Sequence, residues 1–291
     1  MNPELAASVK ADLQARHGGD PEPAPERPGR LRIRGYPGPE QVFLKTLDRS
    51  SADLLACEFE GLEALTATGA VRVPQPLGHG ESGHQAWLAT EFLELKPASN
   101  ASDRKLGSRL AELHEHHGRA HGWHRDNHIG AHPQPNGFHS DWANFFAEQR
   151  IGFQLDSARR QGAPGSLLRA GERLRAAIPG LLAGHQPEPS LLHGDLWSGN
   201  RARLADGTPV IFDPAVHYGD GECDLAMSTL FGRFGDGFYE AYQARRPLPP
   251  GWEFRRDLYQ LYHVLNHFNL FGGGFARQAE TLIQRLLAES G

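Results

Sequence analysis

The segment from His193 to Asn200 constrains the fold of this chain more than any other. It reads HGDLWSGN, and the apolar run Val210-Ile211-Phe212 then leads to Asp213. The surrounding residues, 190–200 and 209–214, predict a short β-patch whose loops carry two carboxylates and one amide. Hard oxygen ligands of this kind suit Mg²⁺.

The spacing H-x-D-x4-N is typical of a phosphotransfer catalytic loop. In such a loop Asp195 orients the acceptor hydroxyl and accepts its proton, and Asn200 holds magnesium, while Asp213 is the second metal-binding residue. A simple turn at 193–195, or a strand cap at Asp213, would explain either part alone. The full pattern favours the catalytic interpretation, with His193 as structural support for the loop.

A lysine on a predicted strand supplies the second part of a nucleotide site. Lys45 ends the run VFLK, and Glu58 follows 13 residues later on a predicted helix. This spacing suits the lysine–glutamate pair of an active kinase lobe. Glu60 would point about 200° around the helix from Glu58, and Glu58 lies nearer the apolar face. A surface salt bridge is the alternative.

The segment 91–97 is expected to join two lobes. We expect Glu91 and Leu93 to contact adenine through main-chain atoms only. Asp224 opens a predicted helix, where the helix dipole favours a carboxylate. Alternatively, Asp224 accepts N–H bonds from the catalytic loop and holds it rigid; both roles are structural.

The order of predicted elements indicates an α+β, two-lobed, protein-kinase-like fold. A β-rich N-lobe over 1–94 holds the nucleotide, and a mostly helical C-lobe over 95–291 carries the catalytic loop and substrate pocket. Short helices are also predicted at residues 5–16 and 106–117. The remaining predicted elements are strands at 31–34, 41–46, 71–78 and 85–95, and helices at 51–68, 142–160, 167–182 and along most of 222–289.

Composition excludes several partners. The net charge is -5, which argues against nucleic acid, and no apolar run is long enough to span a membrane. The two cysteines, Cys57 and Cys223, fit a reducing compartment, so we expect a cytoplasmic protein with no obligate protein partner. We expect His114, His116 and His117 to be the solvated end of a helix.

Longer motifs resemble the fructosamine (ketosamine) kinase family, within the superfamily of aminoglycoside and choline kinases. The resemblance spans roughly residues 41–290 and implies ATP-dependent, Mg²⁺-dependent phosphorylation of O3 of a ketosamine, free or on a protein lysine. This would be a deglycation repair activity, because the modified amine is then released by elimination. The motifs are LLHGDLWSGN (191–200), VIFDPA (210–215), DLAM (224–227), FEGLEAL (59–65), RVPQPLG (72–78), RDNHIG (125–130), DWANFF (141–146) and LYQLYHVLNHFNLFG (258–272).

The resemblance also implies substrate candidates. Trp197, beside the base, could stack on the sugar or its amine, or could pack within the loop. Asp126 and Asn127 belong either to the pocket rim or to a structural turn. Asn266 and His267 lie in an aromatic helix, which favours core packing.

Two segments depart from the family. The glycine-rich phosphate loop is replaced by proline-rich and acidic residues within 18–34. We expect residues 20–30 to be irregular and mobile, with Arg27 or Arg30 as sources of positive charge, and residues 1–19 to be dispensable. Residues 217–223 place Asp220 and Gly221 where the family has His-Arg, which would alter substrate choice.

Two other functions stay open on the sequence. A kinase for another small alcohol, such as an aminoglycoside or an amino alcohol, would share the catalytic loop. A nucleotide-binding pseudokinase would suit the altered phosphate loop, but a scaffold has no physical need for the base and both metal ligands together.

Overall fold

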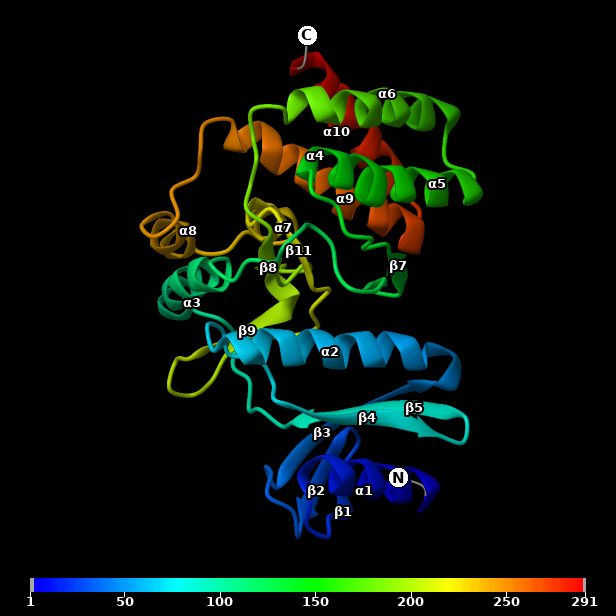
Figure 1. Ribbon diagram of the computed structural model, residues 1–291, viewed down its shortest axis with the longest axis vertical. Coiled ribbons are helices and arrows are strands. Elements are labelled where there is room, and N and C mark those ends of the chain that lie inside the picture. The colour runs from blue at the N-terminus through cyan, green and yellow to red at the C-terminus, as the bar shows by residue number, and fades with distance from the viewer. Residues whose placement is uncertain (1–2, 290–291) are drawn as a thin grey trace.

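A computed structural model describes residues 3–289, which fold into a small β-rich lobe and a larger helical lobe (Figure 1). The predicted α+β, two-lobed architecture is confirmed. No helix of the described residues has the length and apolarity needed to cross a membrane. The boundary after residue 94 stays a prediction.

The small lobe is built on a five-stranded antiparallel sheet. Its order is β1-β2-β3-β5-β4, so the hairpin of β1 and β2 forms one edge. Valine, phenylalanine and leucine in VFLK make β3 a good central strand, and it pairs with β5 from Val42 to Asp48. The strands are β1 (Glu22–Arg27), β2 (Arg30–Arg34), β3 (Gln41–Asp48), β4 (Pro76–Ser82) and β5 (Gln85–Glu91).

One helix covers each face of this sheet. α1 (Pro3–His17) buries Leu5, Val9 and Leu13 in a cluster with β2, β3, β4 and β5. α2 (Ala52–Thr68), which follows the short 3-10 helix η1 (Arg49–Ser51), packs on the opposite face. The expectation that residues 1–19 are dispensable is therefore wrong, because removing α1 would expose the apolar face of the sheet.

Residues 20–30 are ordered, which corrects the prediction of a mobile, irregular segment. They form β1 and the turn into β2, where Pro23 pairs with Ile33 and Pro25 with Leu31. An edge strand tolerates proline when the missing N–H would have faced solvent. The two prolines are two residues apart, so both imino nitrogens face the same side.

Two predicted elements are shifted along the chain. The strand predicted at 71–78 begins at Pro76. The helix predicted at 106–117 is α3 (Asn100–Leu113), which begins earlier because Ser99 and Ser102 form a capping box, a strong helix-start signal.

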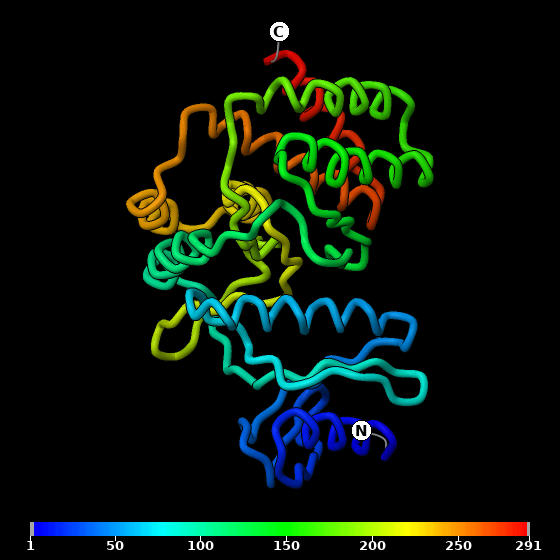
Figure 2. Tube along the Cα trace, viewed as in Figure 1, coloured from blue at the N-terminus to red at the C-terminus, as the bar shows by residue number. Residues whose placement is uncertain are grey.

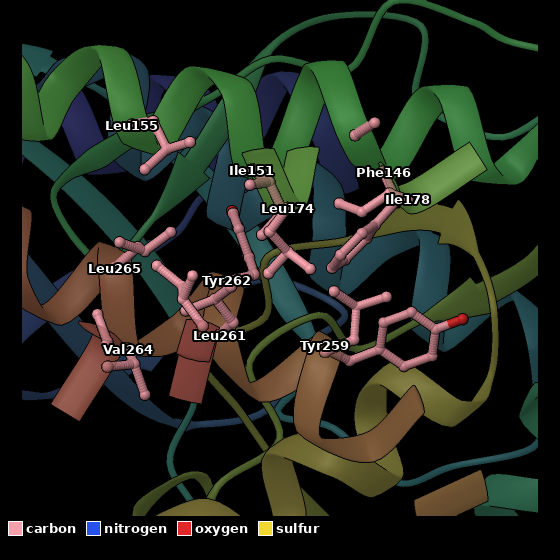
Figure 3. Packing of buried hydrophobic residues seen from close by; sticks show 14 of the residues in the cluster. Phe146, Ile151, Leu155, Leu174, Ile178, Tyr259, Leu261, Tyr262, Val264 and Leu265 are labelled. Atoms are coloured by element: carbon pink, nitrogen blue, oxygen red, sulfur yellow. The ribbon is translucent and has the colours of Figure 1, made fainter. Parts of the chain in front are cut away.

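The large lobe is a helical bundle around α9. Figure 3 shows side chains of η2, α5 and α6 packing against Tyr259, Leu261 and Leu265 of α9. The helix predicted at 142–160 contains a π-helical turn, η2. The elements are α4 (Trp142–Phe145), η2 (Phe146–Gly152), α5 (Phe153–Arg160), α6 (Gly165–Leu181), α7 (Glu222–Leu230), α8 (Asp236–Gln243), α9 (Trp252–Phe271) and α10 (Phe275–Glu289).

Short strands carry the HGDLWSGN motif between the lobes, facing α2 (Figure 2). Gly61 of α2 approaches Pro214 and Val216 closely enough that a Cβ there would lie 3.2–3.3 Å from their side chains. The segments are β6 (Asn127–Ile129), β7 (His132–Gln134), β8 (Ser190–Leu192), η3 (Ser198–Asn200), β9 (Arg201–Arg203), β10 (Pro209–Ile211) and β11 (His217–Gly219).

Candidate active site

The catalytic-loop residues predicted from the spacing lie together on the floor of the interlobe cleft. The side-chain amide of Asn200 donates to the Asp195 main-chain oxygen at 2.9 Å and to Asp195 Oδ2 at 3.2 Å. Asp213, two residues after β10, contributes a carboxylate whose side chain is 52% exposed. Gly194 is required just before Asp195, because its φ is +82° and a Cβ would lie 2.0 Å from the Ala215 oxygen.

Burial raises the pKa of Asp195 well above that of an ordinary aspartate. Desolvation, reinforced by the nearby carboxylates of Asp213 and Asp224, raises the pKa of Asp195 to about 7, against the hydrogen bond from Asn200. A base with a pKa near neutrality is well matched to proton transfer at physiological pH.

Lys45 links the two lobes across the cleft. Its ammonium lies 2.7 Å from Glu58 Oε2 and 3.2 Å from Asp213 Oδ1. Burial would lower the pKa of Lys45, but the two carboxylates outweigh it and raise that pKa, so the lysine is charged at neutral pH. Burial raises the pKa of Glu58 to about 7. Glu60 points elsewhere and pairs with His124.

A cavity of about 390 Å³ lies between the sheet and the floor. Glu91 lines it, but its carboxylate accepts from the Gln75 N–H at 2.7 Å and pairs with Arg72, and its own N–H donates to Gln75. The main chain of Leu93 makes no hydrogen bond within the described residues, so it is the freer of the two adenine candidates. The other lining residues are Phe43, Lys45, Glu58, Leu62, Pro74, Leu88, Thr90, Phe92, Leu95, Phe212 and Asp213.

A second cavity, of about 300 Å³, adjoins the first and reaches Asp195 and Trp197. Trp197 is 36% exposed, and its ring lies over Gly199, where a Cβ would come within 2.3 Å of it. The indole thus packs within the loop and also lines the cavity. His128 also lines this cavity and was not identified from the sequence. Its Nε2 lies 2.9 Å from Asp53 Oδ2, a partner 75 residues away that no local pattern indicates.

The predicted rim residues are tied into the scaffold. Asn127 lines the second cavity but is buried, and its amide donates to the Val216 oxygen while its own oxygen accepts from Gln134 and Asn136. Asp126 accepts from the Asn136 N–H at 2.8 Å. These bonds favour the structural-turn interpretation for both residues.

Asp224 holds the catalytic loop in place through hydrogen bonds to its main chain. Its two carboxylate oxygens each accept a main-chain N–H at 2.8 Å, from His193 and Gly194. The His193 ring is buried and lies 3.0 Å from the Phe212 oxygen, which connects the loop to β10. Burial alone would raise the pKa of Asp224, but its hydrogen bonds outweigh it and lower that pKa.

His114 completes this support, and the prediction that it is solvated is wrong. Its ring is fully buried, with Nε2 at 3.2 Å from Asp224 Oδ2 and Nδ1 at 2.8 Å from the Tyr242 hydroxyl. Burial lowers the pKa of His114. His116, by contrast, is exposed. The neighbouring histidines suggested a solvated helix end, and the partner of His114, Asp224, lies 110 residues away in the sequence.

Asp220 lines neither cavity, so the departure from the family at this position does not face the site. It is buried and accepts from the Tyr259 hydroxyl at 2.7 Å, with His185 Nε2 at 2.6 Å. Asn266 is buried near Gln154, and the His267 ring packs against Phe231 and Phe275, as the core-packing interpretation predicts.

The chain is similar to named proteins over most of its length. A protein named as a probable ketoamine kinase from Synechocystis is 46% identical over 256 residues, covering 86% of this chain and 84% of the relative. The chloroplastic protein-ribulosamine 3-kinase of Arabidopsis thaliana is 41% identical over 248 residues, covering 84% and 76%.

Solved structures agree. A candidate fructosamine-3-kinase from Thermobifida fusca has a TM-score of 0.83 at 31% identity, covering 99% of this chain and 100% of its own. A choline kinase of Streptococcus pneumoniae, with a TM-score of 0.59 at 14% identity over 91% and 92% of the two chains, shares the fold alone. The family model described as fructosamine kinase matches residues 31–289. This chain belongs to the fructosamine kinase family.

Proposed function

We propose that this protein transfers the γ-phosphoryl group of ATP to O3 of a ketosamine. The observation that carries the proposal is the position of Asp195, a buried carboxylate with a pKa raised to about 7. It lines the second cavity, which shares Lys45, Glu58 and Asp213 with the first. The names of the relatives, ketoamine kinase and ribulosamine 3-kinase, support a ketosamine as acceptor.

The reaction needs one proton transfer and one displacement. Asp195 accepts the proton of the 3-hydroxyl, O3 forms a bond to the γ-phosphorus, and the bond from that phosphorus to the bridging oxygen of ADP breaks. Lys45 lies within 3.2 Å of Asp213 and holds phosphate oxygens in line. Positioning and charge stabilisation account for most catalysis of this kind.

The donor atoms fit magnesium. Asn200 uses its amide nitrogen toward Asp195, which leaves the amide oxygen for a cation, and the half-exposed carboxylate of Asp213 provides a second hard ligand. The ion, when bound, supplies positive charge to the nucleotide phosphates. Asn200 and Asp213 would hold it on the floor of the cleft.

Trp197 provides an aromatic wall for the acceptor. The second cavity, about 300 Å³, suits a sugar-derived adduct, and an indole face packs well against the C–H face of a sugar. The substrate is a free ketosamine or the same adduct on a protein lysine. Phosphate at C3 is a better leaving group than hydroxide, so the product can release the amine by elimination.

A panel of acceptors tests the proposal. Purified protein is incubated with Mg-ATP and fructosamine, ribulosamine and erythrulosamine adducts of lysine, with an aminoglycoside and an amino alcohol for comparison. We expect acceptor-dependent ADP formation with the ketosamines alone, and ³¹P–¹³C correlation of the product should place phosphate on C3. Turnover of the aminoglycoside or amino alcohol alone would refute the ketosamine assignment.

A further inference from the structure

The turn between β1 and β2, which lies beside the cavity-lining side chain of Phe43, offers few main-chain donors to a phosphate. It consists of Pro28 and Gly29, between the paired residues Arg27 and Arg30. Pro28 has no N–H, and the Gly29 oxygen accepts from Leu44 N–H at 2.9 Å. A phosphate-binding loop of the usual kind presents successive N–H groups to its anion, and this turn cannot.

The side chain of Arg30 lies on the cleft face of the sheet. Arg30 pairs with Phe43 across β2 and β3, and directly opposed residues share a face. Phe43 is 43% exposed and lines the nucleotide cavity, whereas the next pair, Leu31 and Val42, is buried with α1 on the other face. Arg30 is therefore the cation that the hairpin directs toward the cleft next to its turn.

The guanidinium of Arg30 has an unsatisfied donor. Its Cζ lies 4.1 Å from the centre of the Phe92 ring, which lines the cavity. Its Nε is 3.1 Å from Glu26 Oε2, yet it is buried without a hydrogen bond. Glu26 instead accepts from Arg32 Nε at 2.6 Å. Glu26 is thus shared by two arginines, with Arg32 as its hydrogen-bonded partner. The more weakly held guanidinium of Arg30 can take another anion in its place.

The charges on the floor favour such a cation. Lys45 faces both Glu58 and Asp213, and Asp195 adds a third carboxylate to the cleft. A triphosphate brings further negative charge to a site in which one lysine is shared by two carboxylates. A guanidinium binds phosphate in a bidentate manner and is weakly hydrated, so its transfer from an aromatic ring to a phosphate is favourable.

We propose that Arg30 is the phosphate-binding residue of the hairpin, and that its guanidinium turns from Phe92 to the ATP phosphates. A side chain then replaces the main-chain amides that this turn lacks. The inference rests on the proposed use of ATP and names a contact that the catalytic loop does not provide.

Nucleotide binding without any acceptor tests this contact. Dissociation constants for Mg-ATP, AMP and adenosine are measured by calorimetry for the wild type and for Arg30→Ala. A charge-assisted hydrogen bond predicts a loss of about 10- to 100-fold for ATP, a smaller loss for AMP and none for adenosine. Arg34→Ala is the matched control: it lies on the same strand and face, farther from the turn, and should bind ATP normally.

Glu26→Gln gives an effect in the opposite direction. Removing the carboxylate that competes for Arg30 should tighten ATP binding by about 2- to 5-fold, the range expected for a partly exposed ion pair. A purely structural hairpin would show no gain. Thermal melting of each variant verifies that the fold is intact.

Two results would overturn the inference. Equal losses for ATP and adenosine in Arg30→Ala would mean that Arg30 acts by packing on Phe92, and unchanged ATP binding would mean that it makes no contact. Either result leaves the ketosamine kinase proposal standing if the wild type binds ATP and phosphorylates its acceptor. A wild type that binds no adenine nucleotide would instead refute both.

Discussion

The two walls of the cleft are built in different ways. On the floor, the catalytic loop is held by buried groups: His193 and Asp224 are almost inaccessible to solvent, and two loop N–H groups end on one carboxylate. The opposite wall, here called the roof, is the sheet of the small lobe. Its hairpin of β1 and β2 is an exposed edge, fixed by ion pairs between Glu26 and neighbouring arginines. Exposed pairs of this kind contribute little to stability.

This difference indicates that the reaction fixes the position of the base but leaves the groups that bind the nucleotide variable. A general base must lie within hydrogen-bond reach of one particular proton, so the floor admits few solutions. A nucleotide can be gripped by amides or by guanidinium groups, so the roof can change. The match to the family model begins at Leu31, just beyond the Pro28-Gly29 turn in which we propose that a side chain replaces main-chain amides.

The largest effect is expected on the floor. Asp195→Asn should lower kcat by roughly 10²- to 10⁴-fold, the usual contribution of a positioned base, while ATP binding measured by calorimetry should be retained. Steady-state kinetics with a ketosamine acceptor provides the measurement. Near-normal kcat in this variant would remove Asp195 from the role of base and would erase the contrast between floor and roof.

A core substitution under the roof should reduce stability without altering chemistry. Leu13 of α1 is fully buried against the sheet, and Leu13→Ala should lower the free energy of unfolding by about 2–4 kcal/mol. Gln14→Ala, at the neighbouring exposed position of the same helix, is the control. Urea denaturation measures the change, and kcat well below the melting temperature should match the wild type. An unaltered midpoint would show that Leu13 does not stabilise the packing of α1 on the sheet.

Asp195 on the floor should reduce the free energy of unfolding in a pH-dependent way. The pKa of Asp195 is raised to about 7, whereas an unfolded aspartate has a pKa near 4. The native state therefore favours the protonated form of this carboxyl, and the contribution of Asp195 to stability falls as pH rises from about 4 to 7. Asp195→Asn lacks this term and should exceed the wild type by about 1–3 kcal/mol above pH 7.

The check is urea denaturation of the metal-free and nucleotide-free proteins at pH 4.5, 6 and 8, where about 1.4 kcal/mol corresponds to one pKa unit. The advantage of the asparagine variant should grow across this series. A constant difference at all three pH values would mean that Asp195 titrates normally in the free enzyme.

The smallest effect is expected on the roof. Replacing Pro21, Pro23 and Pro25 together with serine should leave kcat within about 3-fold, because none of these residues lines the cavities, and should reduce stability by about 1–3 kcal/mol through a more flexible unfolded chain. A 100-fold fall in kcat would show that the edge strand shapes the transfer geometry.

Local spacing was sufficient to predict much of the floor. The interval from Lys45 to Glu58 places the glutamate on the inner side of α2, and the structure has this pair at 2.7 Å. The same reasoning failed for His114, because the aspartate and tyrosine that bury it lie more than 100 residues away. No pattern within one helix reports such a partner.

The roof was mispredicted for a different reason. Four prolines within residues 20–30 argue against a strand only if their N–H groups would be needed for pairing. β1 lies at the edge of the sheet, where one side needs no partner, and strand order cannot be derived from local composition. For the same reason the helix predicted at residues 5–16 was found as α1, but its packing against the sheet was not predicted.

The backbone conformation at Asp213 has a consequence for how a mutation could inactivate this enzyme without unfolding it. Asp213 has a φ of +54°, and it is the single non-glycine residue with positive φ among the described residues. Asparagine and aspartate tolerate this conformation better than other side chains with a Cβ. A change to asparagine, which needs one base substitution in the codon, would remove the charge and keep the shape. A gene duplicate could thus become a folded, inert homologue in a single mutational step, whereas most other replacements at this position would also disturb the backbone.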